Sequence, residues 1–380
     1  MLDEDWDTSV DSAPLSARGW VFQERILSPR IIHFGNRQLF WNDGSNGGGN
    51  EQWPMGIPFE ADGLVINDLL SEWWRSAIST LNIYETTFGV WSHIVEEYSK
   101  KKFTYDTDKI AAISGIASEI QDFTGDEFLA GLWKVDLLDQ LLWAVCDPEN
   151  STRIQPYAAP TWSWASINGA IGYVFKDFQF DAHKLSGFHS SYIIKLREAR
   201  IFPILGHGTG PVESGFLRLK GPLRQACLVR GSLESKNRLS WAFGRKRRKI
   251  YFLPDVLLSG ECDRPVSFDQ VEERVGKIFS DWDVKPEYRG FKAQSCIPVH
   301  VPSQSIFLLP IYCASCRGTF ITMGLALVPT KVARGQFRRE GLFFTVNQNR
   351  EESILGLPCD INSLYYEAKE KGDDYMVSIV

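Results

Sequence analysis

The stretch Leu15-Ser-Ala-Arg-Gly-Trp-Val-Phe-Gln-Glu-Arg-Ile-Leu-Ser-Pro-Arg-Ile-Ile-His-Phe34 carries the densest local structural information in the chain. Leu15, Trp20, Gln23 and Leu27 recur at helical spacing within it and predict a helix that turns this stripe, with the Trp20 ring, toward the interior. The helix is expected to end at Ser28-Pro29, because a residue before proline is pushed out of the α region.

A β-hairpin is predicted directly after this helix. Ile31 to Phe34 and Gln38 to Trp41 are short apolar runs, joined through Gly35-Asn36, which tolerate positive φ. We expect the helix to dock onto this hairpin. Residues 44–49 then contain four glycines, a composition that propagates neither helix nor strand and indicates a flexible loop or boundary.

The apolar period changes to 3.6 between about Leu64 and Cys146, which predicts a small helical bundle. Asp106 and Thr107 are the expected N-cap of its second helix, with Gly125 beyond that helix's end. The three expected apolar faces are Phe88, Trp91, Val95 and Tyr98; Ile110, Ile113, Ala117 and Ile120; and Leu137, Leu138, Leu141, Leu142 and Val145.

Beyond Pro156 the chain alternates short apolar runs with Gly- and Pro-containing turns, which predicts an antiparallel β domain. The fold class is therefore α+β. The expected divisions are residues 1–45, a Gly/Pro-rich loop at 46–63, a helical region at 64–155 and a β-rich domain at 156–380. The predicted strands include Phe216 to Lys220, Ile201 to Leu205, Lys249 to Leu253, Ser305 to Leu309, Thr319 to Val328 and Gly341 to Val346.

Charge and composition exclude several classes of protein. A formal charge of −6 creates no overall basic field, so sequence-specific nucleic-acid binding is not expected. The acidic start of the chain and its seven cysteines, an odd number, favour a cytoplasmic protein with reduced thiols. Ile306 to Val328 has the length of a membrane span, but Pro310 and Arg317 argue against one, and Ser315 to Gly318 is better interpreted as a turn between two core strands.

Residues 15–34 resemble the conserved end of fungal heterokaryon-incompatibility (HET) domains, in which Arg-Gly/Ala-Trp, Gln-Glu, Leu-Ser-Pro-Arg and His-Phe recur in this order. Other stretches are similar to the region downstream of that domain, and they follow in the same order. These stretches are Trp91 to Gly115, Leu129 to Trp133, Leu141 to Trp143, Ala159 to Ser166 and Gly335 to Gly341.

The resemblance implies that residues 1–45 are the C-terminal remnant of a HET α/β domain, made of a helix and a hairpin. The family's earlier blocks, Tyr-x-x-Leu-Ser-Tyr-x-Trp-Gly and Trp-x-Asp-x-x-Cys-Ile-Asn-Gln, have no counterpart in the chain. HET proteins act in non-self recognition and programmed cell death, which implies an interaction or regulatory module whose partner is another protein. Two alternatives stay open: a TIR-like NAD glycohydrolase with an incomplete site, and a truncated product without independent function.

Glu24 is the candidate catalytic residue, since a carboxylate flanked by arginines can act as an acid or base. Arg18, Arg25, Arg30 and His33 are the candidate binding residues. The competing interpretation, which we favour, is that these arginines and Gln23-Glu24 tie the helix to the hairpin through ion pairs, and that His33 is a structural histidine on the face opposite Phe34.

No cofactor and no metal are expected. Cys313-x-x-Cys316 has zinc-ligand spacing and is a weak candidate, but Cys296 and His300 lie too far apart on a strand to complete the site. Residues 206–210, Gly-x-Gly-x-Gly, are interpreted as a turn because Pro211 replaces the third glycine of a dinucleotide fingerprint. Trp162 and Trp164 are expected in the core, with both rings on the same side.

One local basic run stands against the acidic average. Arg245, Lys246, Arg247, Arg248 and Lys249 lead directly into an apolar run, so a solvated loop before a strand is favoured over a phosphate-binding patch. The same run leaves a nuclear location open beside the cytoplasmic one.

Overall fold

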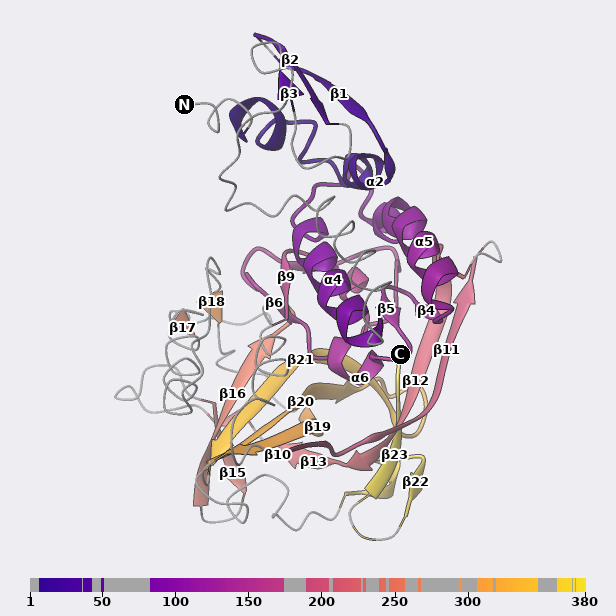
Figure 1. Ribbon diagram of the computed structural model, residues 1–380. Coiled ribbons are helices and arrows are strands. Elements are labelled where there is room, and N and C mark those ends of the chain that lie inside the picture. The colour runs from indigo at the N-terminus through magenta and orange to yellow at the C-terminus, as the bar shows by residue number, and fades with distance from the viewer. Residues whose placement is uncertain are drawn as a thin grey trace.

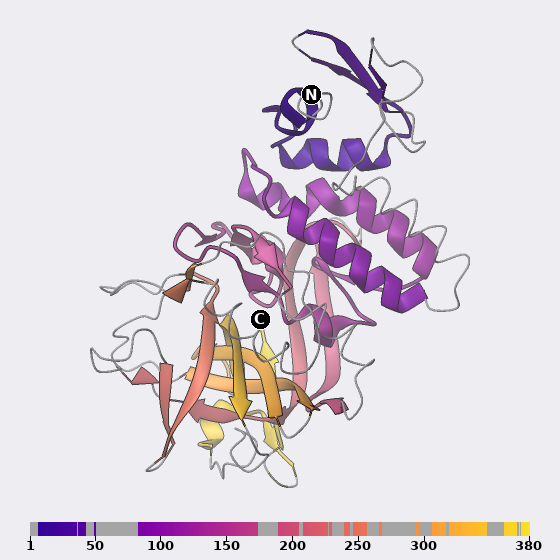
Figure 2. The same cartoon turned by 60° about the vertical axis from the view of Figure 1, so that its left-hand side comes forward.

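The computed structural model describes residues 7–35, 37–42, 49–50, 83–173, 189–204, 208–226, 228–229, 239–243, 246–256, 266–267, 294–295, 306–316, 319–347, 361–370, 372 and 374–380. Figure 1 shows three regions in succession along the molecule: a helix with a hairpin at the N-terminal end, longer helices in the middle, and a large sheet at the opposite end. The turned view in Figure 2 keeps this order. The presence of helices together with a large sheet confirms the α+β class.

The first region, called here the N-terminal unit (residues 7–50), contains the expected helix and hairpin. Ser28 is extended and ends the helix before Pro29, and the Gly35 N–H donates to the Gln38 carbonyl at 3.1 Å to close the hairpin. Both local predictions are confirmed. The elements are η1 (Asp7–Asp11), α2 (Gly19–Leu27), β1 (Ile31–Phe34), β2 (Leu39–Asn42) and β3 (Gly49–Asn50).

The prediction of which face of α2 is buried is wrong. Leu15, Trp20 and Leu27 are 58%, 43% and 41% exposed, whereas Gly19 and Phe22 are buried. The reason is that α2 packs against the helical region as well as lying beside the hairpin, so contacts from distant sequence select the buried face.

The contact between α2 and the helical region is close enough to exclude side chains at two glycines. A Cβ atom at Gly19 would lie 2.0 Å from the Phe103 ring, and one at Gly115 would lie 2.8 Å from Gln23 Oε1. Gln23 Oε1 accepts a 2.6 Å hydrogen bond from the Gly115 N–H, and the Phe22 and Tyr98 rings lie 5.3 Å apart. The N-terminal unit is thus fastened to residues about ninety positions further along the chain.

The helical region (residues 83–155) is only partly a bundle. Residues 114–124 form the expected amphipathic helix, which ends at Gly125 in the left-handed conformation with φ of 70°. Asp106 and Thr107 do not cap it, because they lie in a preceding 3-10 turn. The elements are α4 (Ile83–Tyr98), η2 (Asp106–Lys109), η3 (Ala111–Ile113), α5 (Ser114–Thr124), β4 (Phe128–Leu129), β5 (Leu132–Trp133), α6 (Leu137–Gln140), β6 (Ala144–Val145) and β7 (Thr152–Arg153).

The third predicted helix is wrong beyond its first turn. Helix α6 ends at Gln140, and Ala144 and Val145 instead pair with Gly172 and Ile171 in a short ladder. The apolar side chains are buried as expected, but an apolar run of this length fits a buried turn and strand as well as a helix.

The β domain (residues 156–380) is built on a 12-stranded sheet among the described residues, with the order β10-β19-β20-β21-β16-β15-β14 and β11, β12, β13, β22 and β23 joined beside it. All its pairings are antiparallel except that of β21 with β23, which confirms the antiparallel prediction. Its elements are η4 (Trp164–Ser166), β8 (Ile167–Asn168), β9 (Ile171–Gly172), β10 (His189–Tyr192), β11 (Lys195–Pro203), β12 (Val212–Pro222), β13 (Arg224–Ala226), β14 (Leu228–Val229), β15 (Leu239–Phe243), β16 (Lys246–Pro254), β17 (Val266–Ser267), β18 (Gln294–Ser295), β19 (Ile306–Cys316), β20 (Thr319–Pro329), β21 (Gln336–Asn347), η6 (Ser363–Tyr365), β22 (Ala368–Lys369) and β23 (Asp374–Ile379).

The long apolar stretch Ile306 to Val328 contains two paired central strands, β19 and β20. Of the predicted turn, Ser315 and Cys316 belong to β19, and residues 317–318 lie outside the described residues. No helix among the described residues has the length and apolar character needed to cross a membrane. A single buried cluster of apolar side chains runs from Phe22 through the helical region to Ile379, so the three regions share one core.

Candidate functional site

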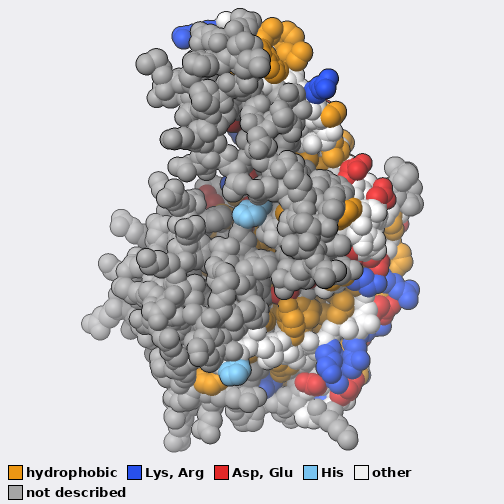
Figure 3. Space-filling view, in the orientation of Figure 1, with side chains coloured by type: hydrophobic (Ala, Val, Ile, Leu, Met, Phe, Trp, Pro, Cys, Tyr) orange, Lys and Arg blue, Asp and Glu red, His pale blue; other side chains and the backbone are white. Residues whose placement is uncertain are grey.

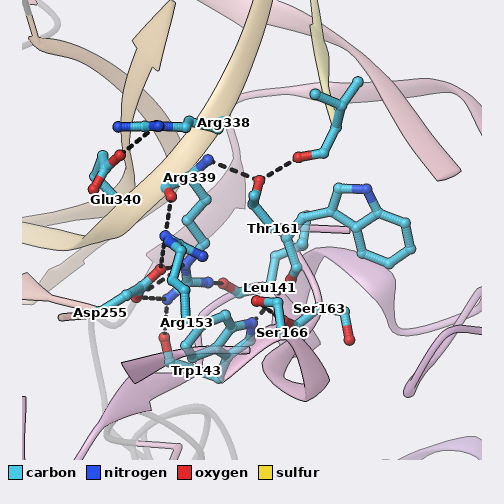
Figure 4. Close-up of polar contacts among 12 residues, drawn as sticks. Leu141, Trp143, Arg153, Thr161, Ser163, Ser166, Asp255, Arg338, Arg339 and Glu340 are labelled. Carbon is cyan, nitrogen blue, oxygen red and sulfur yellow. Dashed lines mark hydrogen bonds and ion pairs between the residues drawn. The ribbon is translucent and has the colours of Figure 1, made fainter. Parts of the chain in front are cut away.

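The most elaborate polar arrangement lies where the helical region meets the sheet, around the buried side chain of Arg339 (Figure 4). Arg339 projects from β21, and its Nε lies 3.3 and 3.1 Å from the two carboxylate oxygens of Asp255, which follows β16. Its Nη2 adds a 3.2 Å bond to Asp255 Oδ1. Neither side chain is exposed, so each depends on the other for compensation of its charge.

Arg339 also bonds across to the helical region. Its Nη1 donates to the Leu141 carbonyl at 2.8 Å and its Nη2 to the Trp143 carbonyl at 2.5 Å. The guanidinium lies 3.3 Å from the centre of the Trp143 ring. Burial lowers the pKa of Arg339 and the charge of Asp255 opposes this shift; the guanidinium stays protonated at neutral pH.

Two further residues complete what we call the junction cluster (Arg339, Asp255, Trp143, Arg153 and Thr161). Arg153 Nη2 donates to Asp255 Oδ2 at 3.2 Å and to the Arg339 carbonyl. Thr161 Oγ1 accepts from the Arg339 N–H at 3.0 Å and donates to the Val380 carbonyl. The cluster therefore connects the helical region, the sheet and the last strand in one hydrogen-bonded unit.

A neighbouring carboxylate belongs to the same strand. Glu340 is buried, and its Oε1 lies 2.6 Å from Arg338 Nε. Burial raises the pKa of Glu340, and the positive charges of Arg153 and Arg338 oppose the shift.

A second buried arrangement, the tryptophan cluster (Trp91, Ala130, Gly131, Ser163 and Trp164), lies beside the junction. The Gly131 carbonyl accepts from Trp91 Nε1 at 2.9 Å and from Trp164 Nε1 at 2.7 Å. The Ser163 hydroxyl donates to the Ala130 carbonyl. Gly131 has φ of 104°, a conformation that L side chains rarely adopt, so this turn depends on glycine.

The tryptophan and junction clusters are linked through the Trp143 indole, whose Nε1 donates to the Trp162 carbonyl at 3.0 Å. Trp162 and Trp164 are fully buried, which confirms their place in the core. They lie in and just before a 3-10 turn, however, so the strand alternation that we expected for them is wrong.

Lys109 is a buried cation that sequence reasoning missed. Its Nζ donates to the Ile167 carbonyl at 2.5 Å and lies 5.7 Å from the centre of the Trp164 ring. Burial lowers the pKa of Lys109 to about 8, against a smaller opposing effect of Asp106. Lys109 is 2% exposed, which closes its amine to a substrate and favours a structural role.

The residues predicted to form a site in the N-terminal unit are only partly brought together. Arg25 forms a 2.8 Å ion pair with Asp11 and donates to Ser16 Oγ at 3.3 Å. Burial, followed by the charge of Arg25, lowers the pKa of His33, while Asp11 opposes this. Arg25 and His33 thus lie within electrostatic range of each other.

The other N-terminal candidates stand apart from this pair. Arg18, Glu24 and Arg30 are exposed, and no hydrogen bond or ion pair within the described part of the chain holds the Glu24 carboxylate. Ion pairs between this helix and the hairpin were expected, whereas the ion pair of Arg25 joins α2 to Asp11 of η1 and the Gln23 side chain bonds to Gly115. A positioned catalytic carboxylate is not seen at Glu24.

The two weak metal candidates lie on one strand. Cys313 and Cys316 are three positions apart on β19, and their backbone partners on β20 are Thr322 and Thr319. Among the described residues no three His, Cys, Asp or Glu side chains gather closely enough to hold a metal ion. Cys296 and His300 lie outside the described residues.

The remaining motifs resolve as turns and strands. Gly208 to Gly210 lie in the turn between β11 and β12, as expected, and Thr209 Oγ1 lies 2.8 Å from Ser118 Oγ of α5. The basic run enters β16 at Lys246, so most of it belongs to the strand and not to a preceding loop.

Sequence reasoning missed the junction cluster although two of its segments had been singled out. Arg339 lies in the stretch Gly335 to Gly341, and Thr161 lies in Ala159 to Ser166. The available signal was a charged residue within a strand-forming apolar run, together with Asp255 directly after another such run.

Comparison with family models, curated proteins and solved structures finds no match for the chain.

Proposed function

We propose that this chain is a HET-type interaction and regulatory module that acts with another protein in fungal non-self recognition and programmed cell death. The resemblance of its sequence to that family supplies the function. The structure supplies one supporting observation, which concerns how the resembling stretches lie relative to one another.

That observation is a continuous series of contacts through all the resembling stretches. Gln23 bonds to Gly115, which ends the second stretch, and Trp91, which begins it, bonds to Gly131. The series continues from Gly131 to Trp164, from Trp162 to Trp143, and from Trp143 to Arg339. Stretches that are scattered over more than three hundred positions of sequence thus form one buried framework.

This framework suits mechanical coupling better than catalysis. Arg339 and Asp255 are buried and paired, and the indole N–H groups of Trp91, Trp143 and Trp164 bond to carbonyl oxygens, whereas the buried Nε1 of Trp162 has no partner among the described residues. A change at the N-terminal unit is transmitted to the β domain through packed side chains and not through a mobile loop. We therefore propose that the framework holds a partner-binding surface in a fixed position relative to the sheet.

The first experiment separates this proposal from the NAD glycohydrolase alternative. Purified chain is incubated with NAD, and nicotinamide release is followed by chromatography. We expect no release above the rate of a boiled sample. Nicotinamide release by the wild-type chain that disappears in the Glu24→Gln variant would contradict the interaction module and favour the NAD glycohydrolase.

The second experiment tests the cellular function. The chain and its variants are expressed from an inducible promoter in a filamentous fungus, and dead compartments are counted by vital-dye uptake. Wild type and Glu24→Gln are expected to cause death equally, whereas Asp255→Ala, which breaks the junction cluster, is expected to be inactive. Hyphae that stay alive with wild-type protein would favour the truncated product without independent function.

We propose a cytoplasmic location, with Arg245 to Lys249 as the segment that would direct any nuclear fraction. A fluorescent fusion tests this, because replacing these five basic residues by Ser should leave a cytoplasmic signal unchanged and remove a nuclear one.

A further inference from the structure

The hairpin of the N-terminal unit has one apolar face that the rest of the described chain leaves open. The antiparallel register puts Ile32 opposite Trp41 and Phe34 opposite Leu39, so these four apolar side chains share a face. Ile32 is 63% exposed and Phe34 is 84% exposed, whereas Phe40, on the opposite face, is 1% exposed. Figure 3 shows hydrophobic side chains on the surface at this end of the molecule, with Lys or Arg side chains beside them.

The backbone N–H and C=O groups of Ile32 and Phe34 point to the open edge of β1. The bond from the Gly35 N–H to the Gln38 carbonyl makes Gly35 and Gln38 a hydrogen-bonded pair, so His33 with Phe40 is the next such pair along the ladder. In an antiparallel ladder the residues between hydrogen-bonded pairs turn their N–H and C=O groups away from the neighbouring strand. Within the described chain β1 pairs with β2 alone, which leaves these groups of Ile32 and Phe34 at an edge.

The charges around this edge select the kind of occupant. From Arg30 through Asn42 the sequence contains two arginines and no carboxylate, and Asp11, which lies within electrostatic range of His33, is already paired with Arg25 at 2.8 Å. Arg30 precedes β1 and Arg37 lies in the turn that follows it, and both side chains are exposed. A second copy of the chain would bring like charges together here, whereas an acidic strand is complementary.

We propose that the edge of β1 binds an extended acidic segment of a partner protein by strand addition. Main-chain hydrogen bonds to Ile32 and Phe34 hold the added strand, and its alternate apolar side chains cover those two residues. Its carboxylates face Arg30 and Arg37. The inference names the partner class for the interaction module and rests on that proposed function.

Binding is measured with a defined probe. The probe is a capped, fluorescein-labelled peptide that alternates Val and Thr and carries Glu at both ends, and its matched control carries Lys instead. Fluorescence anisotropy with the full chain is expected to show binding of the Glu peptide and binding at least about tenfold weaker for the Lys peptide. Hydrogen exchange should show new protection at the Ile32 and Phe34 amides, with no change at His33.

Variants locate the binding to the edge. Ile32→Pro removes the outward N–H without touching a bond to β2, and Phe34→Thr removes the exposed ring. Each variant is expected to weaken binding of the Glu peptide about tenfold, which is the effect of losing one hydrogen bond or a comparable apolar contact. Val332→Thr, which changes an equally exposed apolar residue in the β domain, should have no effect. Unchanged protection of the His33 amide checks that the hairpin is intact in each variant.

Three results would overturn the inference: equal affinity for the Glu and Lys peptides, binding that Ile32→Pro leaves unchanged, or no binding of either peptide. A concentration-dependent dimer in sedimentation that Phe34→Thr abolishes would also overturn it, since a second copy would then cover the edge. The hyphal assay stays independent, because cell death that requires Asp255 in a chain without peptide binding would leave the proposed function standing and remove only this inference.

Discussion

The guanidinium of Arg339 stacks on the indole of Trp143 with 3.3 Å between its carbon and the ring centre, although the two residues are 196 positions apart. One comes from a central strand and the other from the loop after α6. Both side chains are buried, and the stacking and the pairing of Arg339 with Asp255 join the helical region to the sheet. The stability of the whole chain is expected to depend on this contact.

Replacing Arg339 should therefore be severe. Within the described chain, Arg339→Ala leaves the buried Asp255 carboxylate with only the single 3.2 Å bond from Arg153, and we expect a loss of about 3 to 5 kcal/mol in the free energy of unfolding. The matched control is Arg200→Ala, because Arg200 pairs with Glu198 at 2.7 Å but is 64% exposed, and its loss should stay within about 1 kcal/mol. Urea denaturation measures both, and equal losses would show that burial of the junction cluster contributes nothing.

The aromatic residues of α2 should differ in their effects on stability. Trp20 is 43% exposed, and its Nε1 makes only a 3.4 Å bond to Asp108, so Trp20→Ala should cost about 1 kcal/mol or less. Phe22 is buried against Tyr98, and Phe22→Ala should cost about 3 to 5 kcal/mol. The same denaturation experiment decides the order, and a larger loss for Trp20 would mean that the helix is turned the other way.

Two glycine substitutions should have opposite signs. Gly115→Ala places a Cβ 2.8 Å from Gln23 Oε1 and should destabilise by about 1 to 3 kcal/mol through overpacking. Gly89→Ala in α4 meets nothing within 4 Å and should stabilise by about 0.5 to 1 kcal/mol, since alanine favours the helix. Thermal unfolding reports both signs.

A double variant identifies the cause of the Gly115 effect. Adding Gln23→Ala to Gly115→Ala removes the obstructing side chain. The double variant should therefore lose less stability than the sum of the losses of the two single variants. Strict additivity would contradict a direct contact between α2 and α5.

Lys109 predicts a pH dependence with a defined sign. Its folded pKa of about 8 lies below the ordinary value of 10.5, so between these values the unfolded chain holds more protons, and stability rises with pH. Relative to Lys109→Met, wild type should gain roughly 3 kcal/mol across this window and show no relative change below it. Other groups whose pKa changes on folding, such as Cys146, where burial raises the pKa to about 12, are present in both proteins and cancel. Parallel profiles of stability against pH for wild type and Lys109→Met from pH 7 to 10 would mean that the Lys109 ammonium reaches solvent.

Features governed by a few neighbouring residues were predictable. Pro29 ends α2 at Ser28, and Gly125 ends α5. In each case the restriction acts on backbone dihedrals within a residue or two of the breaker, and no distant contact is needed.

Features that depend on a distant partner were not predictable from the sequence. Trp20 and Phe22 lie on the same short helix and are both large and apolar, yet only Phe22 is buried, because Tyr98 and the rest of the helical region approach from its side. Residues 141–145 have the composition of a helix, but Ala144 and Val145 find strand partners in Gly172 and Ile171. Helical spacing identifies amphipathic faces without saying which face meets the core.

The candidate site shows the same division. Arg25 and His33 were named because they lie in a recognisable stretch, and the fold does bring them near each other and near Asp11. The sequence does not single out Arg339, since a lone arginine in a strand is ordinarily exposed. Its burial depends on Asp255, more than eighty positions away, and on carbonyl groups contributed by another region.

The order of residues alone established the α+β composition, the places where the chain turns and the apolar inventory of the core, because these follow from local dihedral preferences and from the cost of exposing apolar surface to water. Tertiary structure alone decided which face of α2 is buried, which charged residues enter the interior together, and that β1 has an edge to which no described strand is paired. Each of these depends on the relative position of segments far apart in the chain, where burial makes a charge tolerable only beside its counterion.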